Sequence, residues 1–277
     1  MQRHKWTTEM DEMLKMAYPH NSDASVAAQM GMSLYTIQTR AKRLKLKKSD
    51  EYRQVFEQQC NLRLQPLKYN YKYTCNHAYF SNIDAGEKAY WLGWLWSDGN
   101  IREQIGSYQI KLELHQNDIY ILEKFKHAIN ADHPILSDRD AVRLCITSKQ
   151  MFFDVQKYGI IPRKSILATQ PNLKEEFIAD FIRGVFDGDG HISKNQQPQV
   201  VILGTEAFCS WLQLVAQRAI GVNGTCALKK NTTFRWTLSG RDNVSAFAKW
   251  MYQPYQNGEQ VICLERKYQR FVEAGLL

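Results

Sequence analysis

The chain has 277 residues and 44% of them are hydrophobic, so it is long enough for two domains and a sizeable core. Its net charge of +8 favours a polyanionic partner, most often nucleic acid. No apolar run reaches the roughly 20 residues of a membrane helix, and no signal-peptide core is present. The six cysteines form no C-x-x-C pair, which argues against a zinc site or a disulfide framework. We therefore expect no membrane association and a reducing, cytoplasmic location.

Residues 1–48 have the pattern of three short helices. A capping box beginning at Thr8 predicts the start of the first helix, and Ser22 or the residue after it can cap the second. Gly31 supplies a turn, and Ser33 caps the third helix. A helix, a glycine turn and a second capped helix are typical of a helix-turn-helix motif.

The third predicted helix is strongly basic. Residues 33–48 hold six Lys or Arg residues and no acidic residue. In a helix-turn-helix the N-terminal residues of this helix meet base edges while basic groups grip phosphates. The stretch from Trp6 onward resembles the small Myb-like or helix-turn-helix modules appended to phage endonucleases. The alternative is a small bundle with a solvated basic face. The DNA-contacting residues expected here are Tyr35, Gln38, Arg40, Lys42 and Arg43.

Residues 49–78 are predicted to be a linker. The stretch from Lys68 to Tyr73 alternates Lys and Tyr. This pattern could follow a DNA groove, or it could be an extended segment lying on the next domain. We favour the linker.

Residues 79–168 and 169–277 each show the order α-β-β-α-β-β-α. Strict alternation of apolar and polar residues predicts antiparallel sheets with one buried and one polar face. The fold class is therefore α+β: a pseudo-twofold pair of αββαββα halves after a small three-helix domain. The predicted helices are Glu87–Ser97, Asp118–Ile129, Gln150–Tyr158 and Glu176–Phe186, and the predicted strands are Tyr108–His115, Val142–Thr147, Gln199–Leu203 and Thr233–Leu238.

Two segments share one pattern. W-L-G-W-L-W-S-D-G occupies Trp91–Gly99, and I-R-G-V-F-D-G-D-G occupies Ile182–Gly190. Each is a helix-like run that carries small residues four positions apart, which lets two helices approach closely. Each run ends with an Asp-Gly pair, so this approach would bring Asp98 and Asp189 together. Two carboxylates at a pseudo-twofold axis suit the binding of divalent metal for work on a two-stranded substrate. A D-G turn after a buried helix is the plainer explanation for either copy alone.

Both segments resemble the LAGLIDADG motif of homing endonucleases, in the single-chain form with two halves. The resemblance covers residues 79–277. The second copy keeps Asp187 at the sixth position and Asp189 at the eighth, whereas the first copy has Trp96 at the sixth position and Asp98 at the eighth. In the family the eighth-position acid is the metal ligand, so the resemblance implies that Asp98 and Asp189 bind Mg²⁺ or another divalent metal.

The resemblance also implies supporting residues. Lys164 and Lys267 resemble family lysines that face the scissile phosphates, and Gln116 follows the first-half strand where a polar active-site residue is common. Surface salt-bridge lysines are the alternative. The polar sheet faces are expected to contact DNA in the major groove, although any solvated sheet carries similar residues. The residues expected there are Gln109, Lys111, Glu113, Arg143, Thr147, Arg235 and Thr237.

We therefore expect a sequence-specific, Mg²⁺-dependent DNA endonuclease that cuts both strands at a long target. It would act as a monomer without an obligate protein partner, in a bacterial or phage-infected cell. The alternatives are a cleavage-inactive DNA-binding regulator and an RNA-binding intron maturase. Trp96 leaves a further alternative, an enzyme that nicks one strand.

Overall fold

The computed structural model describes residues 6–55, 71–104, 107–162, 164, 168, 170–193, 197–230, 232–256 and 262–277. The chain divides into two units, Met1–Tyr69 and Asn70–Leu277. Within the described part of the chain, no helix has both the length and the apolar character needed to cross a membrane.

The first unit contains the three expected helices. They are α1 (Thr8–Ala17), α2 (Asp23–Gln29) and α3 (Leu34–Arg43), with a 3-10 turn η1 (Tyr18–His20) after α1. Each α-helix is capped by a hydroxyl that accepts a backbone N–H in the first turn: Thr7 for α1, Ser22 for α2 and Ser33 for α3. The capping box expected at Thr8 was therefore placed one residue late, because Thr8 is already helical.

A small apolar core holds these helices together. Gly31 has a φ of +63°, a left-handed conformation that L side chains rarely adopt, and it makes the turn between α2 and α3. Helices α2 and α3 lie in the expected ranges, and the helix-turn-helix assignment of this unit stays a prediction. The fully or nearly fully buried residues of this core are Leu14, Val26, Ala27, Ile37 and Ala41.

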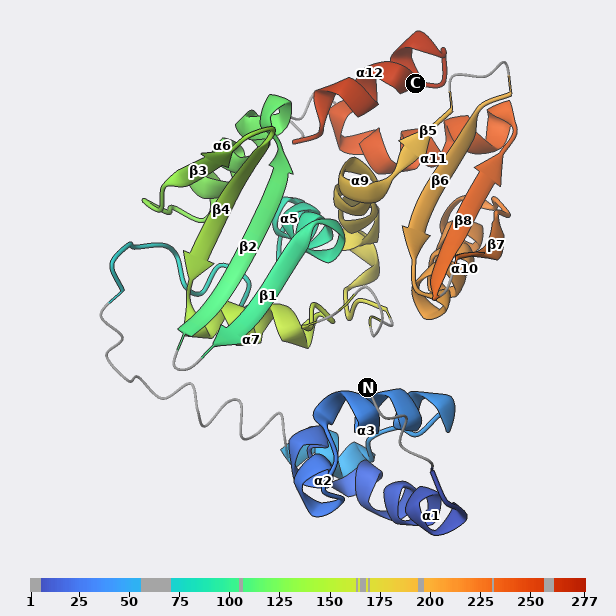
Figure 1. Ribbon diagram of the computed structural model, residues 1–277. Coiled ribbons are helices and arrows are strands. Elements are labelled where there is room, and N and C mark those ends of the chain that lie inside the picture. Colours follow the sequence, from blue (N-terminus) through green and yellow to red (C-terminus); the bar gives the residue numbers. More distant parts are fainter. Residues whose placement is uncertain are drawn as a thin grey trace. The chain divides into compact units, whose positions relative to one another are not determined.

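The second unit repeats one order of elements in its two halves (Figure 1). The first half contains α5 (Gly86–Ser97), β1 (Gly99–Gln104), β2 (Ser107–His115), η2 (Gln116–Asp118), α6 (Ile119–Ala128), β3 (Ile135–Asp138), β4 (Ala141–Thr147) and α7 (Lys149–Lys157). The second half contains η3 (Glu175–Phe177), α9 (Ile178–Asp189), β5 (His191–Ile192), β6 (Gln199–Gly204), α10 (Glu206–Ile220), β7 (Thr225–Lys230), β8 (Thr233–Ser239), α11 (Arg241–Gln256) and α12 (Glu265–Glu273). The expected α-β-β-α-β-β-α order is present in both halves, and α12 follows as an additional helix.

Each half forms one antiparallel four-stranded sheet, and the two sheets have the same topology. The strand orders are β1-β2-β4-β3 and β5-β6-β8-β7. Along β2, Ile110, Leu112 and Leu114 are buried while the residues between them are partly or fully exposed. The central strands β2 and β4 therefore alternate as predicted, with one face packed on helices and one face outward.

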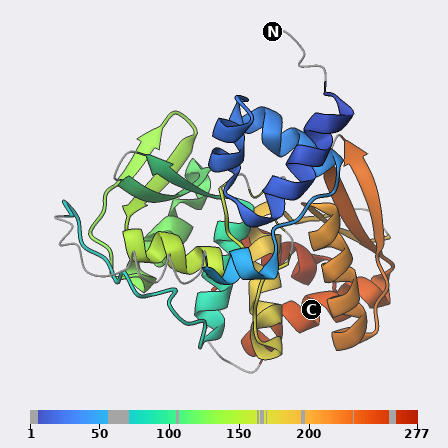
Figure 2. The same cartoon turned by 90° about the horizontal axis from the view of Figure 1, so that it is seen from below.

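Two helices, α5 and α9, pack against each other between the sheets (Figures 1 and 2). A Cβ on Gly93 would lie 2.2 Å from the Phe181 carbonyl oxygen, and a Cβ on Gly184 would lie 2.1 Å from the Tyr90 carbonyl oxygen. Both contacts are with backbone atoms, so only glycine allows this approach. The close packing brings the C-terminal ends of α5 and α9 together.

The linker expected at 49–78 is shorter in the structure at both ends. The Ser49 N–H donates to the Pro19 carbonyl oxygen in the first unit. At the other end, the Thr74 N–H donates to the Asp132 carboxylate at 2.6 Å, and Asn76 N–H donates to the Ile129 carbonyl oxygen. Thr74 and Asn76, at the end of the expected linker, therefore pack within the second unit. Residues 56–70 lie outside the described residues.

Candidate active site

The two aspartates of the repeated motif lie at the ends of the packed helices. Asp98 caps the C-terminus of α5, and Asp189 is the last residue of α9. A Cβ on Gly188 would lie 2.6 Å from the Asp98 Oδ2 atom, so glycine next to Asp189 leaves room for the carboxylate of the other half. Sequence reasoning predicted this juxtaposition, and the structure contains it.

Burial raises the pKa of both aspartates. It raises the pKa of Asp98 to about 6, and the nearby Asp189 charge adds to this rise. Burial also raises the pKa of Asp189. Two carboxylates held close in a partly desolvated place repel each other, so their ionised form is destabilised until positive charge arrives.

Two lysines supply part of that positive charge. Lys164 Nζ donates to the Ser97 carbonyl oxygen at 2.7 Å, and Lys267 Nζ donates to the Phe186 and Gly188 carbonyl oxygens at 2.8 Å each. Ser97 and Gly188 are the residues directly before the two aspartates. Each ammonium therefore satisfies free carbonyl groups at the C-terminus of a motif helix, where the helix dipole favours a cation. This geometry overturns the surface salt-bridge alternative for both lysines.

The two lysines differ in depth. Lys267 is 5% exposed, and burial lowers its pKa to about 8 against the opposing effect of Asp187. Burial also lowers the pKa of Lys164, while the Asp189 and Asp98 charges raise it. The charges of Asp98 and Asp189 therefore raise the pKa of both lysines, which places the lysines and the carboxylates in one site.

The sixth position of the motif differs between the halves, and the structure explains how both residues fit. Asp187 is fully buried and accepts hydrogen bonds from Tyr90 Oη at 2.8 Å and from the Leu264 N–H at 2.7 Å. Leu264 is the N-cap of α12, the helix that carries Lys267. Asp187 therefore ties α12 to α9. Sequence reasoning noticed Asp187 as part of the motif but had no signal for this partner, which lies 77 residues away.

Trp96, the residue at the same position in the first copy, lies among aromatic rings instead. Its ring centroid lies 5.5 Å from that of Phe181 and 5.3 Å from that of Phe208. An indole with aromatic neighbours stabilises this site by burial and ring packing. Asp98 remains the C-cap of α5 with its carboxylate close to Gly188, so Trp96 does not displace the carboxylate of the first half.

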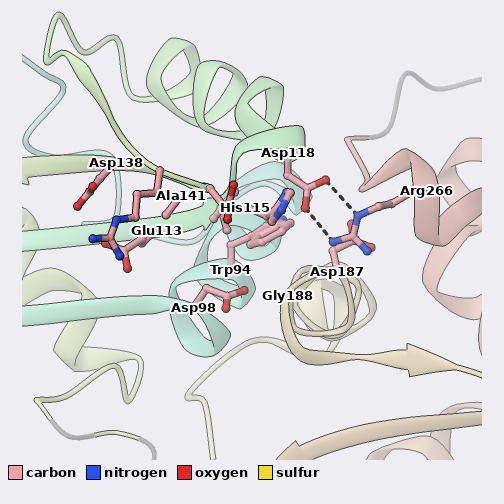
Figure 3. Close-up of a pocket in the computed structure, with 13 residues that line it drawn as sticks. Trp94, Asp98, Glu113, His115, Asp118, Asp138, Ala141, Asp187, Gly188 and Arg266 are labelled. Carbon is pink, nitrogen blue, oxygen red and sulfur yellow. Dashed lines mark hydrogen bonds and ion pairs between the residues drawn. The ribbon is translucent and has the colours of Figure 1, made fainter.

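A cleft of about 560 Å³ opens beside Asp98 (Figure 3). Glu113 and His115 line it from the end of β2, and Asp118 and Arg266, which form an ion pair, line it as well. The Arg266 Nη2 and Nε atoms lie 2.8 and 3.1 Å from the two Asp118 carboxylate oxygens. This pair links the first half to α12, and sequence reasoning missed it because its members are 148 residues apart.

A second pocket lies beside Asp189. It is lined by Lys164 and Thr205 and by the apolar side chains of Trp96 and Leu203, among others. The two aspartates thus face unlike surroundings, with several acidic groups around Asp98 and a lysine with apolar neighbours beside Asp189.

The donor set fits a hard divalent cation that keeps much of its water. Within the described ranges, no group of three or more His, Cys, Asp or Glu residues is arranged to hold a metal ion. Asp98 and Asp189 provide two carboxylates, which repel each other in the absence of a cation. Mg²⁺ is commonly bound by one or two carboxylates, with water and phosphate oxygens completing its octahedron. The pair therefore suits Mg²⁺ better than Zn²⁺, which prefers a closed set of nitrogen and sulfur ligands.

Gln116 directly follows β2, as the sequence predicted. It is exposed at the start of η2 and lines neither of the two pockets, and its role in the site stays a prediction. In the second half, Thr205 is the N-cap of α10, and its hydroxyl donates to the Ala168 carbonyl oxygen at 2.6 Å.

The outward sheet faces contain all the predicted sheet residues. In the first sheet, the register pairs Gln109 with Thr147 and Glu113 with Arg143, and Lys111 lies between them on β2. In the second sheet, Arg235 and Thr237 are outward while Trp236 is buried. Sequence reasoning missed Asn100 and Arg102 of β1, which pair with Lys111 and Gln109 and so share their face. Strand β1 lacks the regular alternation that identified β2.

In the first unit, two of the expected DNA-contacting residues already have partners. Arg40 Nε donates to the Asp11 carboxylate at 2.7 Å, and the guanidinium lies 5.2 Å from the Trp6 ring centroid. Gln38 donates to the Asp23 carboxylate at 2.9 Å. These contacts join α3 to α1 and α2, and the predicted DNA contacts of Gln38 and Arg40 stay predictions. The expected residues that remain exposed are Tyr35, Lys42 and Arg43.

Comparison with known proteins supports the repeated-motif interpretation in the second half. Residues 176–251 match the family model of the LAGLIDADG-like domain. The matched range contains α9 with Asp189, and both central strands of the second sheet. No curated protein matched the chain.

Solved structures give weaker likenesses. Meganuclease I-SmaMI bound to uncleaveable DNA is 13% identical, with 65% of this chain and 87% of that chain aligned and a TM-score of 0.47. The I-LtrWI LAGLIDADG homing endonuclease bound to target DNA is 12% identical, with 73% and 90% aligned and a TM-score of 0.48. I-DmoI in complex with DNA and Ca is 16% identical, with 64% and 90% aligned and a TM-score of 0.43.

Proposed function

We propose that this protein is a sequence-specific homing endonuclease that hydrolyses phosphodiester bonds in both strands of duplex DNA. The single observation that carries the proposal is the meeting of Asp98 and Asp189 at the ends of two glycine-packed helices, with one lysine beside each. The match of residues 176–251 to the LAGLIDADG-like domain supports it independently.

Asp98 and Asp189 would hold Mg²⁺, which when bound would activate water and stabilise the leaving oxygen. The chain's own carboxylates set the place of this chemistry, because the helix pair holds them rigidly and partly out of water. Their raised pKa values show that the ionised carboxylates are destabilised, so a bound cation would stabilise them. Because the two carboxylates repel each other when no cation is bound, the site favours the metal-bound state over the metal-free state.

The lysines would act on the phosphate groups. Lys267 uses two of its three N–H donors on carbonyl oxygens, which fixes the ammonium while leaving one donor for an oxygen of the substrate. Lys164 uses one donor on the Ser97 carbonyl oxygen. Fixed cations beside a phosphate that gains charge during hydrolysis stabilise the transition state without reorganising.

The outward sheet faces would bind the major groove on either side of the cut. Arg143 and Arg235 are both outward and suit guanine edges. The exposed Tyr35, Lys42 and Arg43 of the first unit would provide a second DNA contact, which raises affinity because the two units are tethered. We infer monomeric action, since both carboxylates come from one chain.

The test is cleavage of a randomised duplex library with Mg²⁺ by the full chain and by the Asp98→Asn and Asp189→Asn variants. Discrete double-strand cuts that both variants lose support the proposal, and the variants also control for a contaminating nuclease. Specific binding without cuts across several divalent metals would favour a regulator. Single-strand nicks by the wild type would favour a nickase, and preference for RNA would favour a maturase.

A further inference from the structure

The two sheets present matched positions that can be compared one by one. In each sheet the second strand pairs with the strand that carries an outward arginine: β2 pairs Glu113 with Arg143, and β6 pairs Leu203 with Arg235. Toward the N-terminal ends of β2 and β6, every second residue continues to form an equivalent cross-strand pair in the two sheets. The matched cross-strand pairs are Glu113–Arg143 with Leu203–Arg235, Lys111–Cys145 with Val201–Thr237, and Gln109–Thr147 with Gln199–Ser239.

The outward side chains at these matched positions differ in chemistry. Arginine is present in both sheets, but Glu113 and Lys111 of the first sheet correspond to Leu203 and Val201 of the second. In the first sheet Lys111 and Glu113 form an ion pair at 3.0 Å. The second sheet has no charge at either of these two positions.

Val201 and Leu203 are not core residues of the second unit. Their neighbours along β6, Val200 and Ile202, are fully buried and point to the helices, whereas Val201 and Leu203 lie on the opposite face and stay partly exposed. Ala227 of β7 pairs with Arg235 and is exposed beside them. We call Val201, Leu203 and Ala227 the apolar strip.

The position of the apolar strip restricts what it can contact. Leu203 also lines the pocket that contains Asp189, so the strip begins next to the proposed site of cleavage and shares its face with Arg235. A duplex held for cutting there would place base edges against it. In the major groove the only apolar group that a base presents is the C5 methyl of thymine. Apolar side chains facing other bases would leave buried polar edges without partners, which costs binding energy.

We propose that the second half reads thymine methyl groups with Val201 and Leu203, beside the base read by Arg235. The first half reads polar base edges with Lys111 and Glu113 at the matched positions. The two half-sites of the target therefore differ in kind, with thymines close to the cut on one side only. This inference rests on the proposed function, because it takes the outward sheet faces as the DNA surface.

The first experiment uses the wild-type full chain and a target selected from a randomised duplex library. Each thymine of the target is replaced in turn by uracil, which removes only the methyl group, and binding is measured at fixed salt. We expect a loss of about fourfold per methyl at the two positions that face Val201 and Leu203, from the burial energy of one such group. We expect no uracil effect at the matched positions of the other half-site.

Three variants assign the effect to the apolar strip. Val201→Ala should lose the thymine-over-uracil preference at one position, whereas Lys111→Ala, its match in the first half, should keep it. The double change Val201→Lys with Leu203→Glu should move the base preference of the second half-site away from thymine. Circular dichroism confirms that each variant is folded before binding is compared.

The outcomes separate this inference from the proposed function. Sequence-specific binding with uracil neutral throughout the second half-site overturns the inference alone, as does an unchanged thymine preference in folded Val201→Ala. Specific binding with the uracil effect but without cutting refutes the endonuclease and supports the methyl readout. A wild type without any sequence preference overturns both.

Discussion

Replacing Asp98 by Asn should make the metal-free protein more stable while it destroys the active site. In the folded state burial raises the pKa of Asp98 from its usual 3.8 to about 6. A carboxyl whose pKa is higher in the folded than in the unfolded state binds its proton more tightly when folded. Its ionisation therefore costs almost nothing below about pH 3, costs progressively more as the pH rises from 3 to 6, and reaches its full cost above pH 6.

The magnitude follows from the size of the shift. One pKa unit corresponds to about 1.36 kcal/mol, so a rise of about two units gives at most about 3 kcal/mol. Asp98 is partly exposed, and solvent screening reduces this figure, so we expect about 2 kcal/mol at pH 7. Asn has nearly the same shape and no charge, and it should recover this energy.

The assay is urea unfolding in EDTA, followed by tryptophan fluorescence. All tryptophans except Trp6 lie in the second unit, so the signal reports that unit. Asp98→Asn should raise the free energy of unfolding at pH 7 and raise it several-fold less at pH 4. Glu123→Gln, which removes an exposed carboxylate on α6, should change neither value by more than about 0.5 kcal/mol. A difference that is independent of pH, or a destabilised Asp98→Asn at pH 7, would refute the reasoning.

Three further experiments test the helix packing, the tryptophan and the lysine. Gly93→Ala should destabilise the second unit by about 3 kcal/mol in urea, because its Cβ meets backbone at 2.2 Å; a change below 1 kcal/mol would contradict the glycine argument. Trp96→Asp should cost more than about 3 kcal/mol without adding activity, whereas Trp96→Phe should cost less; equal costs would count against aromatic packing. The pKa of Lys267 of about 8 predicts that cleavage falls above pH 8 as the ammonium is lost. Lys267→Arg, which stays charged, should lack this fall, and an unchanged pH profile would exclude Lys267 as its source.

Much of the fold could be predicted because its signals are local. Alternation along Tyr108–His115 and Thr233–Leu238 identified two strands, and hydroxyl residues before apolar runs identified the helix starts. The repeated Asp-Gly ending identified both carboxylates. Each of these signals depends on a few neighbouring residues. The edge strand β7, whose six residues are all exposed, has no such pattern and was not predicted.

The residues that support the site could not be predicted, because their partners are distant in sequence. Nothing near Asp187 indicates that it accepts the Leu264 N–H, and nothing near Asp118 indicates Arg266. The ion pair of Arg40 could not be predicted either, because a basic helix surface and an internal ion pair have the same local sequence. Its contact with Asp11 is decided by the packing of α1 on α3.

The central claim is that Asp98 and Asp189 together form one site that cuts both strands. It is tested most directly by strand-resolved cleavage of a selected duplex target with Mg²⁺, using end-labelled strands, for the wild type and the two single Asn variants. The account predicts that the wild type cuts both strands and that neither Asp98→Asn nor Asp189→Asn makes a double-strand cut. Wild-type protein that binds the target tightly but leaves both strands whole, or a variant that cuts both strands at the wild-type rate, would contradict it.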